Sequence, residues 1–249
     1  MLPQQTLTTL RELRLAGMAD AYEVQLRDAD AHQLSFDERL GLLADQEWSR
    51  RQSRRLARRL KEAKLPLNAT VEDIDYTVPR GLDRALIRTL AQGRWILDHL
   101  PTLVTGPAGV GKTYIASALG HAACRQGYTA RYFRVSRLLA DLGIAKADGS
   151  YPRFLARLAK TDVLILDEWG LVPMSVADAR ELLDVIDDRY MRRSTIIASQ
   201  LPVDAWHGTI PDPSLGDALL DRIVHAAHRI ALRGESMRKL RAAKASDGG

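Results

Sequence analysis

A glycine-rich run at residues 106–113 reads Gly-Pro-Ala-Gly-Val-Gly-Lys-Thr and fits the G-x-x-x-x-G-K-[ST] pattern at every fixed position. Glycines let the backbone curl so that its N–H groups point at phosphate oxygens, and the helix behind adds its positive dipole end. In such a cradle Lys112 neutralises the β- and γ-phosphates, and the Thr113 hydroxyl coordinates Mg²⁺. The run therefore predicts a site for ATP and Mg²⁺. The residues expected to contact the nucleotide are Gly106, Pro107, Ala108, Gly109, Val110, Gly111, Lys112 and Thr113.

A pair of carboxylates, Asp167 and Glu168, directly follows the apolar run 163–166. Four apolar residues without alternation are typical of a strand that is covered on both faces, and ligands of such sheets lie beyond the carboxyl ends of the strands. We expect Asp167 to hold Mg²⁺, directly or through water, and Glu168 to polarise the water that attacks the γ-phosphate. The pair favours ATP hydrolysis over a binding switch that holds ATP without turnover.

The elements that must position these residues alternate along the chain. After about residue 81, short apolar runs alternate with helical periods, which predicts an α/β domain with a parallel sheet flanked by helices. The expected strands are 100–105, 130–135, 163–166 and 195–199, and the expected helices are 112–125, 136–143, 150–159 and 177–191.

The N-terminal quarter of the chain predicts helices alone. Ser35 and Glu38 form a capping-box pattern at the start of a helix that Pro66 ends, and Gly17 interrupts an earlier amphipathic period. We therefore expect a small all-helical domain that binds DNA or a partner over 1–66, a linker over 67–80, the ATPase domain over 81–245 and a disordered tail over 246–249.

Composition excludes several classes of protein. The 249 residues contain one cysteine, Cys124, so an intramolecular disulfide is impossible, which suits a cytoplasmic location. No apolar run approaches the roughly 20 residues of a membrane span, and the first residues do not form a signal peptide, so we expect no membrane association. The net charge of +5 is unevenly distributed, which indicates a polyanionic partner better than the total does.

The densest run of positive charge lies in one expected helix. Residues 50–64 carry eight basic side chains and one acidic side chain, whereas residues 1–49 carry four basic and nine acidic ones. Helical spacing places the basic side chains on one half of the helix surface, and arginine forks bind phosphates. Contact with the backbone of duplex DNA is one interpretation; a solvated helix face and an acidic protein partner are the others. The candidate DNA-binding residues are Arg50, Arg51, Arg54, Arg55, Arg58, Arg59 and Lys61.

Three further polar residues follow the acidic pair. Gln200 ends the fourth expected strand, Arg222 lies in a helix and Arg238 opens another. With the glycine-rich run and the acidic pair, this order resembles the AAA+ ATPases. The resemblance implies that Gln200 is sensor I, that Arg222 is an arginine finger acting on ATP in a neighbouring subunit, and that Arg238 is sensor II. The adjacent Ser199 is also polar, so the sequence leaves sensor I open between these two positions.

The chain also resembles a narrower family, the IstB-like ATP-binding proteins, which are transposition helper ATPases related to the DnaC helicase loaders. The resemblance implies an ATPase that oligomerises on duplex target DNA, as a ring or a filament, and delivers the DNA to a cognate transposase. A DnaC-like replicative helicase loader is the alternative, because its ATPase core would be nearly the same. Ile74 and Tyr76 are the candidates for contacting adenine. The motifs that carry the resemblance are at 34–40, 50–61, 80–84, 106–113, 164–170, 198–202, 217–222 and 234–238.

Overall fold

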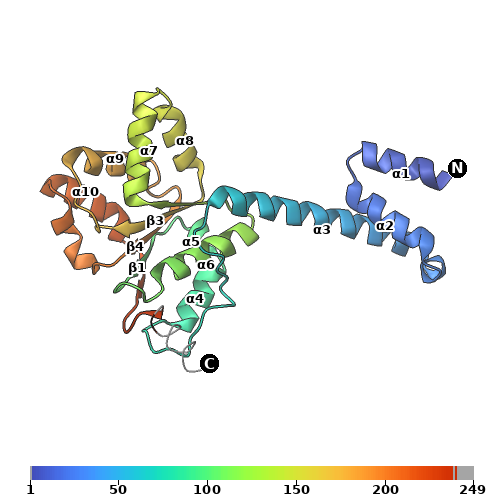
Figure 1. Cartoon of the computed structure of the whole chain (residues 1–249), viewed down its shortest axis with the longest axis horizontal. Helices are drawn as coiled ribbons and strands as arrows, with labels where there is room; N and C mark the ends of the chain where they lie inside the picture. The colour runs from blue at the N-terminus through green and yellow to red at the C-terminus, as the bar shows by residue number, and fades with distance from the viewer. Residues whose placement is uncertain (1, 238, 240–249) are drawn as a thin grey trace. The chain divides into compact units, whose positions relative to one another are not determined.

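The computed structural model describes residues 2–237 and 239 (Figure 1). Contacts divide the chain into two compact units, residues 1–58 and residues 59–249. The division falls inside helix α3 (Phe36–Ala63), because this helix continues unbroken from one unit into the next. It therefore comes earlier than the boundary at residue 66 that the sequence suggests. The expected disordered tail, 246–249, lies outside the described residues.

The first unit consists of α1 (Leu2–Glu12), α2 (Ala16–Arg27), a short 3₁₀ helix η1 (Asp30–Gln33) and most of α3. The capping box is present, because the Ser35 amide donates to Glu38 Oε2 at 2.8 Å and the Glu38 amide donates to Ser35 Oγ at 3.3 Å. The Gly17 amide donates to Glu47 Oε2 at 2.6 Å. A Cβ at Gly17 would lie 2.7 Å from the Glu47 Cα, so this glycine permits the close packing of α2 against α3.

The second unit is built on a five-stranded parallel sheet with the order β2-β3-β4-β1-β5. Strand β4 lies between β1 and β3, so the carboxyl ends of these three strands are neighbours. The glycine-rich run follows β1, Gln200 follows β4, and the acidic pair lies near the end of β3. The sequence did not predict β5, because two of the four residues of this short edge strand are polar and its buried side chain is Ile230 alone. The strands are β1 (Thr102–Thr105), β2 (Ala130–Arg134), β3 (Val163–Trp169), β4 (Ser194–Ser199) and β5 (His228–Ala231).

Helices cover both faces of this sheet. Leu164 and Leu166 belong to a core cluster shared with α7 to α10, whereas Ile165 lies against Gly120 of α6 on the other face. This alternation explains why the apolar run of β3 is continuous. The helices are α4 (Arg84–Ala91), α5 (Arg94–Leu97), α6 (Lys112–Arg125), α7 (Val135–Ala147), α8 (Tyr151–Lys160), α9 (Val176–Asp187) and α10 (Pro213–Val224), with short 3₁₀ helices η2 (Val203–Ala205) and η3 (His207–Thr209). No helix within the described residues is long and apolar enough to cross a membrane.

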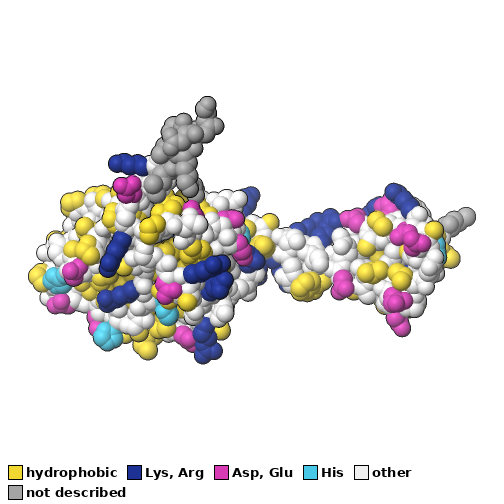
Figure 2. Space-filling view, turned by 90° about the horizontal axis from the view of Figure 1, so that it is seen from below, with side chains coloured by type: hydrophobic (Ala, Val, Ile, Leu, Met, Phe, Trp, Pro, Cys, Tyr) yellow, Lys and Arg dark blue, Asp and Glu magenta, His cyan; other side chains and the backbone are white. Residues whose placement is uncertain are grey.

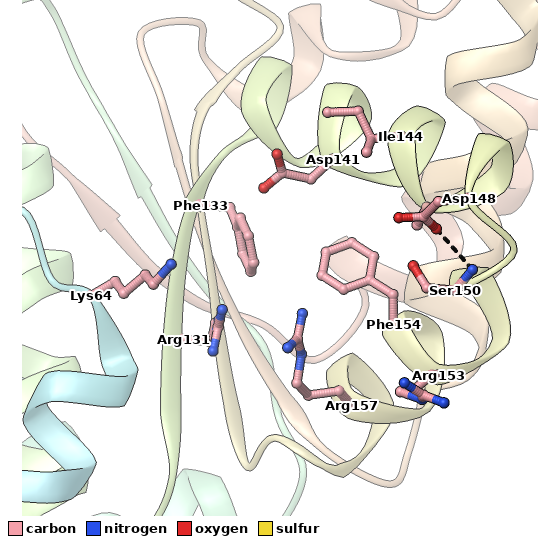
Figure 3. Close-up of a pocket in the computed structure, with 11 residues that line it drawn as sticks. Lys64, Arg131, Phe133, Asp141, Ile144, Asp148, Ser150, Arg153, Phe154 and Arg157 are labelled. Carbon is pink, nitrogen blue, oxygen red and sulfur yellow. Dashed lines mark hydrogen bonds between the residues drawn. The ribbon is translucent and has the colours of Figure 1, made fainter.

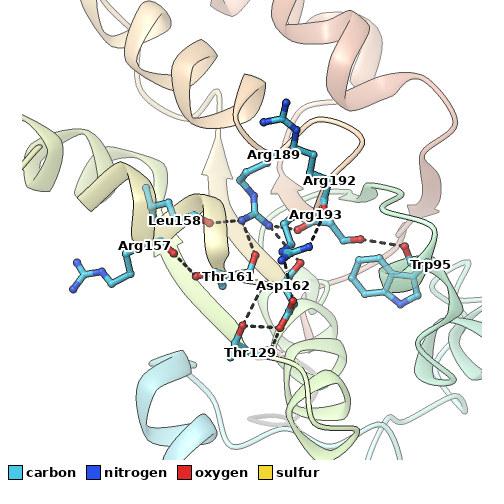
Figure 4. Close-up of polar contacts among 10 residues, drawn as sticks. Trp95, Thr129, Arg157, Leu158, Thr161, Asp162, Arg189, Arg192 and Arg193 are labelled. Atoms are coloured by element: carbon cyan, nitrogen blue, oxygen red, sulfur yellow. Dashed lines mark hydrogen bonds and ion pairs between the residues drawn. The ribbon is translucent and has the colours of Figure 1, made fainter. Parts of the chain in front are cut away.

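A buried arginine fastens the loops at the starts of β3 and β4 (Figure 4). Arg189 is 1% exposed and donates to the Thr161 carbonyl at 2.7 Å, to Thr195 Oγ1 at 3.2 Å and to the carbonyls of Leu158 and Ser194. Burial lowers the pKa of Arg189 to about 9, which still leaves the guanidinium charged at neutral pH. The turn that buries Arg189 also ends α9 at Asp187, earlier than the expected helix 177–191.

Residues 67–80, which the sequence suggests as a linker, pack onto the second unit. Ala69, Ile74 and Arg80 are buried, and Arg80 Nη1 donates to the Val110 carbonyl at 3.0 Å. The prolines and the asparagine of this stretch correctly indicate irregular backbone, but irregular backbone can still make buried contacts. The segment is a packed part of the second unit rather than a free linker.

Candidate nucleotide-binding site

The glycine-rich run forms a tight loop between β1 and α6. Gly106 and Gly109 have φ angles of 143° and 83°, a region that favours glycine. A Cβ at Gly106 would lie 2.4 Å from the Leu232 carbonyl oxygen. The Met237 amide donates to the Gly109 carbonyl at 2.9 Å, so residues that follow β5 lie directly against the loop. The loop therefore curls at the carboxyl end of the sheet, as expected for a phosphate cradle.

A cavity of about 580 Å³ opens beside this loop and brings together residues from distant parts of the chain. Its volume is within the range of small-molecule sites. The residues predicted from sequence that line it are Ala108, Gly109, Gly111, Lys112, Thr113, Asp167, Glu168 and Gln200. Those that the sequence did not predict are Leu67, Asn68, Asp73, Asp75, Arg80, Tyr114 and Met237.

Asp167 joins the loop to the neighbouring strands. Thr113 Oγ1 donates to Asp167 Oδ2 at 2.7 Å, and the Tyr132 hydroxyl donates to the same oxygen at 2.9 Å. Burial and the Asp167 charge raise the pKa of Tyr132, so its hydroxyl remains a hydrogen-bond donor. No cluster of three metal-ligating side chains occurs among the residues that the structure describes. One carboxylate and one hydroxyl fit Mg²⁺ bound mainly through phosphates and water, rather than a metal held by protein ligands alone.

Glu168 has a left-handed backbone conformation, with a φ of 62°. Consecutive residues of a regular strand point to opposite faces, yet Asp167 and Glu168 both line the cavity. The register of β3 against β4 shifts between Leu166 and Trp169, and this irregularity turns the two carboxylates towards the same space. Arg134 Nε lies 3.5 Å from Glu168 Oε1. The strained backbone thus explains how neighbouring acids share one site.

Lys112 and Gln200 complete the polar lining. Lys112 is 8% exposed, and its ammonium donates to the Pro107 carbonyl at 2.7 Å. Gln200 is exposed and lines the cavity. The Ser199 hydroxyl instead donates to the Trp169 carbonyl at 2.7 Å and accepts from the Leu201 amide at 3.1 Å. Geometry thus favours Gln200 over Ser199 as the residue that faces a nucleotide.

Among the described residues, several that the sequence predicts for the site do not line the cavity. Arg222 on α10 pairs with Asp187 at 2.5 Å and does not line the nucleotide cavity of its own chain. Arg238 lies outside the described residues. Ile74 is buried and Tyr76 lies under Arg84, with the guanidinium carbon 5.3 Å from the ring centroid.

The suggestion that Ile74 and Tyr76 contact adenine stays a prediction. Neither Ile74 nor Tyr76 lines the cavity, whereas Leu67 and Met237 do. Irregular backbone has no periodicity from which the inward-facing side chains could be read. The sequence motifs also do not identify Tyr132 and Arg134, which contact the acidic pair. Their spacing of two at the end of a strand places both on one face of the sheet.

The basic residues of α3 differ in their surroundings. Arg50 pairs with Asp20, and Arg51 pairs with Glu47 at 2.6 Å, so both take part in the packing of the first unit. Arg54 and Arg55 are exposed and form no ion pair within the described part of the chain. Figure 2 shows Lys and Arg side chains gathered along this helix. The predicted stripe therefore contains residues that hold the fold as well as residues that face solvent.

Solved structures resemble about two thirds of the chain. The crystal structure of the DnaC helicase loader matches with a TM-score of 0.57 and 19% identity, covering 68% of this chain and 99% of that chain. The crystal structure of DnaI matches with a TM-score of 0.58 and 19% identity, covering 66% of this chain and 91% of that one. At such identities the likeness shows the fold alone, which is the AAA+ P-loop fold predicted from the sequence.

Sequence relatives extend over nearly the whole chain. An insertion-sequence ATP-binding protein of Sinorhizobium fredii is 50% identical over 239 residues, covering 96% of this chain and 98% of its own length. The ATP-binding protein of insertion sequence IS1162 from Pseudomonas fluorescens is 55% identical over 203 residues, covering 81% of this chain and 88% of its own length. The sequence profile of the IstB-like ATP-binding proteins matches residues 8–245. The chain therefore belongs to the IstB-like ATP-binding protein family.

Proposed function

We propose that this protein is an ATP-hydrolysing transposition helper, which oligomerises on duplex target DNA and delivers it to a cognate transposase. The observation that carries the ATPase part is the single cavity shared by the glycine-rich loop, Thr113 and both acids of the pair. The insertion-sequence relatives support the transposition part. The helical N-terminal unit and its basic helix supply the proposed contact with DNA.

The cavity suggests a division of work among its residues. Lys112 would bind the β- and γ-phosphates, and Thr113 and Asp167 would hold Mg²⁺, whose positive charge would stabilise negative charge on the phosphates. Glu168 orients the attacking water and accepts its proton. Gln200 directly follows β4, which lies between β1 and β3. In this proposal it forms a hydrogen bond to the γ-phosphate or to the attacking water. In this proposal Arg222 serves the cavity of an adjacent subunit, and Arg238 acts as sensor II.

Tyr132→Phe should raise the Mg²⁺ concentration needed for tight ATP binding by about tenfold, because hydrogen-bonded partners of metal ligands tune metal affinity. The Tyr132 hydroxyl bonds the Asp167 oxygen that Thr113 also contacts. A Mg²⁺ titration of ATP binding measures the effect without turnover. Tyr128→Phe is the matched control, because Tyr128 lies on the same unit and does not line the cavity. An unchanged Mg²⁺ midpoint in Tyr132→Phe would show that this hydroxyl does not orient Asp167.

Alanine at Arg54, Arg55, Arg58 and Arg59 should weaken binding to duplex DNA and flatten its salt dependence. For every phosphate that the variant no longer neutralises, the slope of log K against log salt should fall by about 0.9. Fluorescence anisotropy at several salt concentrations measures that slope. A control with alanine at Arg27, Arg88, Arg192 and Arg229 removes the same charge from other exposed positions. Equal slopes for wild type and the α3 variant would mean that these side chains do not contact phosphates.

A gel shift with duplex DNA, with and without ATP, tests the proposal most directly. ATP-dependent binding to duplex is the expected result. The AAA+ fold is shared with a helicase loader, so a replicative helicase is the alternative partner. Binding to a helicase in a pull-down, without binding to duplex DNA, would favour the loader and contradict the transposition helper.

A further inference from the structure

A second cavity, of about 400 Å³, lies in the second unit among residues of β2, α7 and α8 (Figure 3). It shares no lining residue with the nucleotide cavity. Two side chains from β2, Arg131 and Phe133, face Phe154 and Arg157 of α8 across it. Four of its lining residues are basic and two are acidic, so the cavity has a cationic excess. The basic ones are Lys64, Arg131, Arg153 and Arg157, and the acidic ones are Asp141 and Asp148.

The two arginines nearest the phenylalanine rings are held close together. The Arg131 guanidinium lies 5.5 Å from the centre of the Phe133 ring, and that of Arg157 lies 5.0 Å from the centre of the Phe154 ring. Burial and the nearby Arg157 charge lower the pKa of Arg131. The Arg131 Nε atom is buried and has no hydrogen-bond partner within the described residues. An anion between these guanidiniums would relieve their repulsion and satisfy a buried donor.

The acidic residues already have partners and lie to one side. Asp141 pairs with Arg137 at 3.0 Å, and Asp148 accepts a hydrogen bond from the Ser150 amide at 2.9 Å. Figure 3 shows both carboxylates on the side of α7, away from Arg131 and Arg157. The charges of Glu62 and Asp141 also act on Arg131, but less than the charge of Arg157 does, so the side of Arg131 and Arg157 keeps a cationic excess that favours an anion.

We infer that the cationic side of this cavity binds a phosphodiester of duplex DNA, as a second DNA contact on the ATPase unit. This inference rests on the proposed DNA binding. Lys64 directly follows α3, and its basic neighbours Arg59 and Lys61 belong to the same unit, so the cavity continues the basic run of that helix. Phosphate matches the paired arginine forks.

The aromatic residues of the cavity favour the DNA backbone over the bases. Phe133 and Phe154 are 6% and 8% exposed, and their rings meet edge to face at 6.2 Å. Neither ring has an open face on which a base could stack, so the contact is to phosphate and carries no sequence preference.

Arg131→Gln combined with Arg157→Gln tests the inference in the full-length protein. The double variant should reduce the salt slope of duplex binding by about 1 to 2 and lower the affinity by about tenfold at moderate salt, as expected when one or two phosphates are no longer neutralised. The matched control, Arg192→Gln with Arg229→Gln, removes two exposed charges from positions outside the cavity and should keep the slope. ATP turnover without DNA should be unchanged in both.

The outcomes separate this inference from the proposed function. Duplex binding by the wild type with an unchanged slope in the double variant would overturn the inference and leave the proposed function standing. If the double variant lost the ability to bind poly-glutamate but still bound duplex DNA like the wild type, the cavity would be a site for an acidic protein. That result would also overturn the inference. Absence of duplex binding by the wild type would defeat the proposed function itself. If Arg131→Gln does not fold, the exposed pair Lys64→Gln and Arg153→Gln provides the same measurement.

Discussion

Replacing Glu168 with Gln should lower ATP turnover at least about 100-fold and change ATP affinity by no more than about twofold, because a general base contributes at that scale to the chemical step. Gln keeps the shape of the side chain but cannot accept the proton of the attacking water. Glu168 lines the same cavity as Lys112 and Thr113 without belonging to the glycine-rich loop. Phosphate release in the presence of DNA measures turnover, and titration with a fluorescent ATP analogue measures affinity.

Glu12→Gln is the matched control, because Glu12 is exposed in the first unit and should affect neither quantity. Near-normal turnover by Glu168→Gln would show that another group activates the water. Mixing Glu168→Gln subunits with Arg222→Ala subunits extends the test. Some turnover should return, since one type of junction then pairs an intact Glu168 with an intact Arg222. Activity that never rises above the sum of the separate variants would contradict an arginine finger acting between subunits.

Lys112→Ala should weaken ATP binding by roughly 30-fold to 1,000-fold, since losing a largely buried charged partner of a phosphate costs about 2–4 kcal/mol. Lys112 is 8% exposed, and its ammonium is held at the loop by the Pro107 carbonyl. Isothermal titration calorimetry with a slowly hydrolysed ATP analogue measures the decrease in affinity.

Lys160→Ala is the control, since Lys160 is an exposed lysine at the end of α8. An unchanged urea midpoint for Lys112→Ala would show that the weaker binding arises at the site and not from unfolding. Wild-type affinity in Lys112→Ala would refute the proposed role of this residue.

The parts of the site that could be predicted from sequence are those whose chemistry is local. The loop pattern contains its own glycines, lysine and threonine, and the acidic pair directly follows its own apolar run. The capping box of α3 likewise needs only Ser35 and Glu38. Because each motif sets its own backbone conformation, its residues can be identified before the fold is known.

The remaining parts depend on tertiary packing. Tyr132 reaches Asp167 only because β2 and β3 are neighbours in the sheet, and Met237 reaches Gly109 only after the chain has completed β5. Strand β5 carries too little apolar periodicity to be recognised, and the contacts of residues 67–80 follow no period at all. The ion pair between Arg222 of α10 and Asp187 of α9 joins residues far apart in the chain, so neither local sequence indicates it.

The left-handed backbone conformation of Glu168, near the end of β3, affects how the coding of this site can be passed on. On a regular strand, the side chains of two adjacent acidic residues would point to opposite faces of the sheet. Because Glu168 has a φ of 62°, its side chain and that of Asp167 face the same cavity. The residue proposed to hold the metal and the residue proposed to orient the water are therefore encoded by consecutive codons. A recombination event that transfers the end of β3 therefore transfers both residues together.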